Sequence, residues 1–141
     1  MYHEKKMIMK KIEIPSSIEN LTIVEKLVDE LYEKIKFDTE LYANILVCVT
    51  EAVKNSIVHG NKEIINNNVS IQYSFNDVQI TFVISDTGEG FNHYMVEDPT
   101  IPENIEKESG RGIFLMNCLA DQVIYNDKGN EVTLKFFYRL E

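Results

Sequence analysis

The apolar residues of this chain repeat with two different periods, and the change between them restricts the fold more than any other feature. Between residues 17 and 59 they recur every three or four positions, which is typical of amphipathic helices. From residue 69 onward they largely alternate with polar residues, which is typical of strands with one buried face. Helices followed by hairpins predict an α+β fold, a two-layer sandwich with helices on one face of a mainly antiparallel (mixed) sheet.

The first half of the chain predicts an edge strand and two helices. The strand covers residues 7–14 and the first helix residues 17–36, where Ser16 and Glu19 have the form of a capping box. The second helix is expected to begin at Asp38 or Thr39 and to end at Gly60.

The second half predicts two hairpins separated by a short buried helix. The hairpin strands are expected at residues 69–75 and 78–84, and at 122–126 and 131–139. The helix covers residues 112–120, and its Phe114 and Met116 are expected in the core. Cys48 and Cys118 lack metal-ligand spacing and are expected to be reduced core thiols.

The charge balance disfavours two classes of partner. The chain has 23 acidic and 14 basic residues, for a net charge of −9, so its field repels nucleic-acid phosphates and anionic lipid headgroups. We therefore expect no direct nucleic-acid partner and no membrane partner. The longest apolar stretch is far shorter than the roughly 18 residues of a membrane span, and the N-terminus lacks a signal-peptide core. A cytoplasmic location is expected.

Three polar side chains recur every four residues on the second expected helix. Glu51, Asn55 and His59 therefore project from nearly the same face. A carboxylate and an amide oxygen stacked in this way offer a general base and a ligand for Mg²⁺, which prefers oxygen donors and keeps several waters. The alternative interpretation is a solvated polar stripe.

A turn with two glycines follows the expected strand 78–84. Its residues are Asp86, Thr87, Gly88, Glu89 and Gly90. Glycines at the end of a strand let a ligand approach the backbone closely, and an aspartate there can accept a hydrogen bond from an exocyclic amine. The turn is neither a P-loop nor a dinucleotide-binding fingerprint. An ordinary glycine turn is the alternative.

A second glycine motif leads into the expected helix 112–120. Gly110 and Gly112 flank Arg111, so N–H groups, a helix dipole and a cation are available to an anion. These features predict a phosphate site, and a simple glycine hinge is the alternative.

Together and in this order, the motifs resemble those of the GHKL superfamily of ATP-binding domains, the histidine-kinase-like ATPases with the Bergerat fold. The segments that carry the resemblance are TEAVKNSIVHG (50–60), SDTGEGF (85–91) and SGRGIFLM (109–116). They look most like the anti-sigma-factor serine/threonine kinases of bacteria. The likeness covers roughly residues 12–139 and implies one ATP-binding domain over residues 1–141, with a lid at about residues 92–111.

The resemblance implies roles for the polar residues of the first two motifs. Asn55 would hold Mg²⁺ against the phosphates of ATP, and Glu51 would act as the base on an incoming serine hydroxyl. Asp86 would bind the amino group of adenine. Phosphoryl transfer requires mainly positioning and charge neutralisation, which these residue types supply.

The resemblance also implies roles for the glycines. Gly88 and Gly90 would shape the adenine side of the site, and Gly110 and Gly112 would close the lid onto the phosphates. The chain departs from this kinase branch at Glu108, where members often carry a basic residue, and Arg111 is the candidate replacement.

The partners implied by the resemblance are a STAS-type anti-anti-sigma protein, as the substrate, and a sigma factor. Exchange between them would depend on the nucleotide state. A homodimer fits the family likeness, although the residue pattern itself does not demonstrate one. Two alternatives stay open: a non-catalytic ATP-binding switch, and a detached ATP-binding domain of a histidine kinase.

Overall fold

The computed structural model describes residues 8–90 and 108–138. The predicted lid, residues 92–111, falls outside this range except for its last four residues. These four begin the third helix, which starts four residues earlier than the sequence pattern indicates.

The described strands form one five-stranded sheet in the order β1-β2-β3-β5-β4. The strands are β1 (Ile8–Pro15), β2 (Asn68–Phe75), β3 (Gln79–Ser85), β4 (Gln122–Tyr125) and β5 (Glu131–Phe137). All four neighbouring pairs are antiparallel, and β1 lies at one edge as predicted. Along the two central strands, buried side chains alternate with half-buried ones, which is the pattern of a sheet covered on one face.

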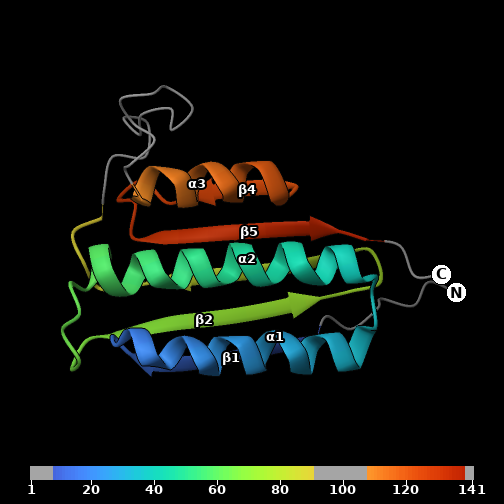
Figure 1. The fold of residues 1–141 in the computed structure, drawn as a ribbon, viewed down its shortest axis with the longest axis horizontal. Coiled ribbons are helices and arrows are strands. Elements are labelled where there is room, and N and C mark those ends of the chain that lie inside the picture. Colours follow the sequence, from blue (N-terminus) through green and yellow to red (C-terminus); the bar gives the residue numbers. More distant parts are fainter. Residues whose placement is uncertain (1–7, 91–107, 139–141) are drawn as a thin grey trace, which may run out of the picture.

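Within residues 8–90 and 108–138, three α-helices cover that face: α1 (Leu21–Ile35), α2 (Thr39–Asn55) and α3 (Glu108–Leu119). They lie side by side, with α2 between the other two (Figure 1). Helix α2 begins where the sequence predicts, because a carboxylate oxygen of Asp38 accepts a hydrogen bond of 2.7 Å from the backbone N–H of Leu41. The two-layer α+β prediction is confirmed.

The core lies between α2 and the central strands. Helix α2 buries Ile45, Cys48 and Val49 completely, and the rings of Phe82 and Phe136 meet edge to face at a centroid distance of 6.4 Å. Burial of each such large side chain stabilises the fold by about 1.5–3 kcal/mol. By length and hydropathy alone, α2 with the turn after it could cross a membrane, but here it is the central core helix.

The predicted capping box is wrong. A short 3-10 turn, Ile18–Asn20, precedes α1; its N-cap residue is Ser17, whose side chain makes no capping hydrogen bond. Ser16 is instead fully buried, and its hydroxyl donates a 2.5 Å hydrogen bond to the backbone carbonyl of Asn67. The serine joins β1 to the segment before β2, so its partner is distant in sequence.

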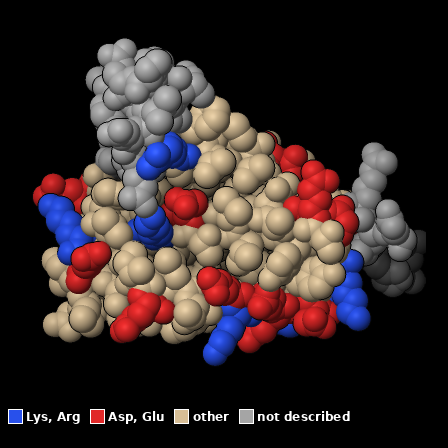
Figure 2. All heavy atoms as spheres, viewed as in Figure 1, with Lys and Arg blue, Asp and Glu red and all other residues tan. Residues whose placement is uncertain are grey.

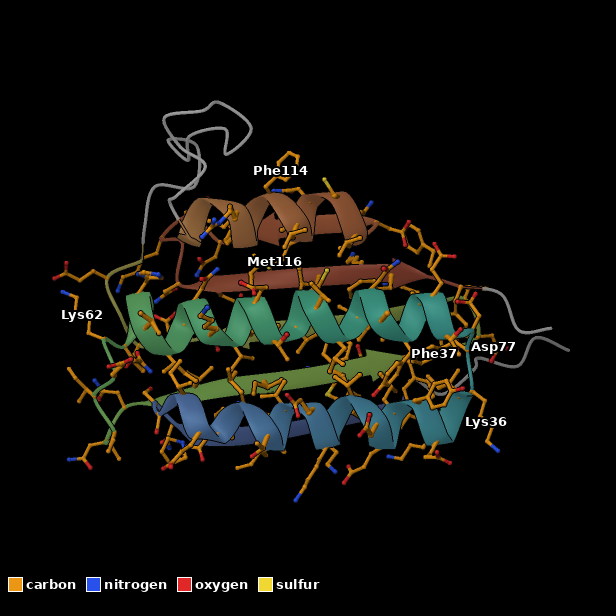
Figure 3. The ribbon with its side chains drawn as sticks, viewed as in Figure 1. Lys36, Phe37, Lys62, Asp77, Phe114 and Met116 are labelled. Carbon is orange, nitrogen blue, oxygen red and sulfur yellow. The ribbon has the colours of Figure 1, made fainter. Side chains whose placement is uncertain are left out.

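Helix α3 corrects two further predictions. Met116 is buried as expected, but Phe114 is 41% exposed and points away from the molecule (Figure 3). Two residues along a helix are about 200° of rotation apart, so only one of the pair faces α2. Cys118, again two residues after Met116, is also exposed, and only Cys48 is a core thiol.

Candidate functional site

The last turn of α2 and the turn that follows it carry the first group of candidate residues. Glu51 and Asn55 lie one helical turn apart and are both half-buried. After Asn55 the helix widens into a π-helical turn, η2 (Ser56–Gly60), a feature that is frequent at functional sites. The spacing of four residues is lost in this wider turn, and His59 is exposed.

Gly112 of α3 lies directly against this part of α2. A Cβ atom at position 112 would lie 2.5 Å from Oε2 of Glu51 and 3.7 Å from Nδ2 of Asn55. Gly112 is buried, whereas the neighbouring Arg111 is exposed. The first and third sequence motifs therefore meet in the fold. Gly110 lies in the first turn of α3, two residues before this contact.

Asp86, directly after β3, lies against the other end of the π-helical turn. A Cβ atom at Gly60 would overlap the carboxylate of Asp86, so only glycine leaves space for that group. The backbone N–H of Gly88 donates a 2.8 Å hydrogen bond to Oδ1 of Asp86, and the hydroxyl of Ser56 donates another to the same carboxylate. Because Ser56 follows Asn55 in the chain, its bond to Asp86 brings the second motif, residues 86–90, next to the other two motifs.

The surroundings of Asp86 raise the pKa of its carboxyl group above the ordinary value. Burial raises the pKa of this carboxyl group, against the smaller opposing effects of the Gly88 and Ser56 hydrogen bonds and of the Lys128 charge. A partly desolvated acid with a raised pKa at the end of a strand is a candidate for ligand recognition.

The turn between β4 and β5 supports the loop that carries Asp86. The backbone N–H of Asp86 donates to the carbonyl of Asn130 at 3.0 Å, and Nδ2 of Asn130 donates to the carbonyl of Gly88 at 3.3 Å. Gly90 has a φ of 81° and lies so close to the carbonyl of Lys128 that a Cβ atom would overlap it. The positive φ and the close contact with the Lys128 carbonyl therefore each require glycine at position 90.

Sequence reasoning missed three residues of this site: Ser56, Gly60 and Asn61. The sequence pattern marks Gly60 only as the end of the helix. It does not mark Ser56, which lies between Asn55 and His59. Asn61, the next residue, is buried and hydrogen-bonded to Thr87. For Ser56 and Gly60 the available signal was their place in the same segment as Asn55, residues 50–60, whereas Asn61 lies just beyond it.

The described residues contain no group of three or more His, Cys, Asp or Glu side chains that could hold a metal ion. The described side chains nearest to Gly112 are those of Glu51 and Asn55, which offer a carboxylate and an amide oxygen. This small set fits Mg²⁺ shared with ligand phosphates and water, because Mg²⁺ commonly takes only one or two protein ligands. It does not fit a closed metal site formed by the protein alone.

An open groove of about 860 Å³ lies at the opposite end of α2. Phe37, Leu41 and Phe137 line it together with the acidic residues Asp38, Glu40 and Asp121, and none of the described residues that line it is Lys or Arg. Acidic side chains also gather on the lower and right parts of the helix face (Figure 2). A groove of this composition repels phosphate, so it is not the anion site indicated by the glycine motifs.

Comparison with known proteins gives three findings. Residues 14–136 match the family described as the histidine kinase-like ATPase domain. The serine-protein kinase RsbW from Staphylococcus aureus strains JH9 and Newman is 28% identical over 138 residues, which cover 91% of this chain and 86% of the relative. The fold resembles the crystal structure of the RsbU and RsbW domains of Rv1364c from Mycobacterium tuberculosis.

That structural match has a TM-score of 0.65 at 16% identity, which shows a shared fold. It covers 94% of this chain and 32% of the other, so the present chain spans about a third of that protein.

Proposed function

The chain belongs to the histidine kinase-like ATPase (GHKL) family, whose members bind ATP, and from this membership we propose that it is an ATP-dependent serine/threonine kinase. Its substrate is a STAS-type anti-anti-sigma protein, and its second partner is a sigma factor. The named kinase relatives support the branch. The observation that carries the proposal is the contact of Gly112 with Glu51 beside Asn55, which places a candidate base next to a candidate phosphate-binding helix.

Glu51 acts as the general base in this proposal. Its carboxylate takes the proton of the substrate serine hydroxyl while the serine oxygen bonds to the γ-phosphorus of ATP. The bond between that phosphorus and the β–γ bridging oxygen breaks, and ADP leaves. Gly112 leaves the carboxylate room, and the exposed Arg111 supplies a positive charge near the N-terminus of α3.

Asn55 holds Mg²⁺, which neutralises charge on the phosphates when bound. Asp86 accepts a hydrogen bond from the amino group of adenine, and Gly88 and Gly90 shape the adenine side of the site. Gly110 and Gly112 bring the start of α3 to the phosphates.

In this proposal the bound nucleotide determines which partner the protein binds. A partner that prefers the ATP-bound form is exchanged for one that prefers the ADP-bound form, and the difference in affinity supplies the driving force. In this proposal the protein acts in the cytoplasm, together with its partners. A homodimer is compatible with this scheme.

The decisive experiment incubates the protein with Mg-ATP and a STAS protein from the same genome and measures phosphoserine by mass spectrometry. We expect phosphorylation by the parent chain and by Glu40→Ala, a control at the exposed start of α2. Glu51→Ala should lose it while keeping its affinity for ATP. No phosphoserine with any STAS partner, despite tight ATP binding, would support the non-catalytic switch instead.

The metal role has its own test. Asn55→Ala should abolish the magnesium-dependent part of ATP binding in calorimetry. Asn44→Ala, another half-buried asparagine of α2 but in the groove at its other end, should not change it. Undiminished magnesium-dependent affinity in Asn55→Ala would contradict the role of this residue.

A further inference from the structure

The side-chain amide of Asn61 is buried and uses its full hydrogen-bonding capacity. The residue is 2% exposed. Nδ2 donates to Oγ of Ser16 at 2.9 Å and to the carbonyl of Asn68 at 3.1 Å. Oδ1 accepts from the backbone N–H of Thr87 at 2.9 Å and from its hydroxyl at 3.1 Å. An amide has two N–H donors and two acceptor lone pairs, so none is left over.

These four bonds join segments that are far apart in the sequence. Ser16 follows β1, Asn68 begins β2, and Thr87 belongs to the loop after β3. The backbone N–H of Asn61 itself donates to the carbonyl of Ser56 at 2.7 Å, which closes the π-helical turn. One side chain therefore holds the loop after β3 in register with the end of helix α2.

The loop held in this way is the one that carries Asp86. Thr87 is the next residue, and Gly88 packs on the carbonyl of Gly60, where a Cβ atom would overlap it. Thr87 is exposed, so burial of its own side chain does not fix the loop. Its backbone N–H and its hydroxyl both donate to the side chain of Asn61. The Asp86 carboxylate is thus oriented by Asn61 through Thr87 as well as by its own bonds to Gly88 and Ser56.

We infer that Asn61 is a positioning residue for base recognition: acting through Thr87, it aims the Asp86 carboxylate at an adenine amino group. The inference rests on the proposed function only as far as nucleotide binding. A carboxylate accepts a hydrogen bond from the amine of adenine and repels the carbonyl oxygen of guanine at the same place, so its aim determines the preference for ATP over GTP.

Other side chains cannot replace this amide. Aspartate has the same shape but no donors for Ser16 and Asn68, and it adds a charge beside Asp86. Leucine and alanine leave four polar groups, of Ser16, Asn68 and Thr87, without this partner. The role therefore requires both ends of an asparagine amide.

The test compares ATP and GTP binding by calorimetry for the parent chain, Asn61→Ala and Asn76→Ala. Asn76 is a matched control at the far end of the sheet, where its Oδ1 orders the β2–β3 turn by accepting from the N–H groups of Val78 and Gln79 at 2.9 and 3.0 Å. Both variants should melt at lower temperature than the parent. Only Asn61→Ala should bind ATP about tenfold more weakly while its GTP affinity stays the same.

A double-mutant cycle asks whether Asn61 acts through Thr87. Thr87→Val should weaken ATP binding about threefold, and Thr87→Ser, which keeps the hydroxyl, should restore it. In the Asn61→Ala background, Thr87→Val should have no further effect. If Asn61→Ala does not fold, the comparison of the valine and serine variants at the exposed position 87 is sufficient.

The outcomes separate this inference from the proposed function. An unchanged ratio of ATP to GTP affinity in Asn61→Ala, or equal ATP affinity in Thr87→Val and the parent, would overturn the positioning role and leave the kinase proposal standing. ATP binding without phosphotransfer would overturn the kinase proposal and leave the positioning role. A parent chain that does not bind ATP would overturn both.

Discussion

The carboxylate of Glu51 lies against Gly112, so close that any side chain at position 112 would displace it. This contact connects α2 and α3 at the point where the proposed base and the proposed phosphate-binding helix meet. Glycine is disfavoured inside helices, and its presence in α3 is explained by the space that the carboxylate needs. Substitutions at the contact therefore test the site without removing any polar group.

Gly112→Ala should slow phosphotransfer about 100-fold, because a displacement of the catalytic group by about 1 Å has an effect of this size. The free energy of unfolding should change by less than about 1 kcal/mol, since alanine favours the helix while the Glu51 side chain must move. Steady-state kinetics and thermal melting measure the two quantities. Asn117→Ala, at an exposed position of the same helix, is the control, and equal rates in both variants would argue against the contact.

Asp86→Asn should have two separate effects, one on how the melting temperature depends on pH and one on the affinity for ATP. The folded state raises the pKa of Asp86, so the carboxyl group favours folding at low pH, and this contribution is lost as the pH rises through the raised pKa. Asparagine has no such step, while its amide oxygen can still accept from Gly88 and Ser56.

The melting temperature of Asp86→Asn relative to the parent should therefore increase between about pH 3 and pH 7. At neutral pH its ATP affinity should fall about 10- to 100-fold, because a hydrogen bond to a charged group is lost. A constant difference in melting temperature across this range would show that Asp86 is not desolvated in the folded protein.

The two cysteines should differ in reactivity. Burial raises the pKa of Cys48 to about 12, whereas Cys118 is exposed on α3. A thiol reagent at pH 8 should modify one cysteine rapidly in the native protein and the second only after denaturation. Cys118→Ser should remove the rapid phase, and two rapid equivalents in the parent would contradict the burial of Cys48.

Periodicity was sufficient to predict the fold because most elements here have one clear apolar face. Helix α3 is the exception: its segment around Phe114 and Met116 is apolar on all sides, so the sequence could not indicate which residue faces α2. Ser16 fits a local capping pattern, but its partners Asn61 and Asn67 come from a distant segment. A pattern of neighbouring residues carries no information about contacts with distant segments.

For the candidate site, too, only some of the residues could be predicted from the sequence. The glycine and carboxylate motifs indicated the right segments, and the fold brings Glu51, Asn55 and Gly112 together. The functional roles of these residues stay predictions. Asn61 could not be selected from the sequence, because its importance lies in bonds to residues 16, 68 and 87, which only the folded chain brings within reach.

Hydrogen exchange during an ATP titration tests the central claim most directly, which is that three separate segments bind one nucleotide. We predict that amides in residues 50–60, 85–90 and 108–116 gain protection with the same half-saturating ATP concentration. The turn at residues 76–79, at the far end of the sheet, should not change. Protection confined to one of the three segments, or centred on residues 76–79, would contradict the account.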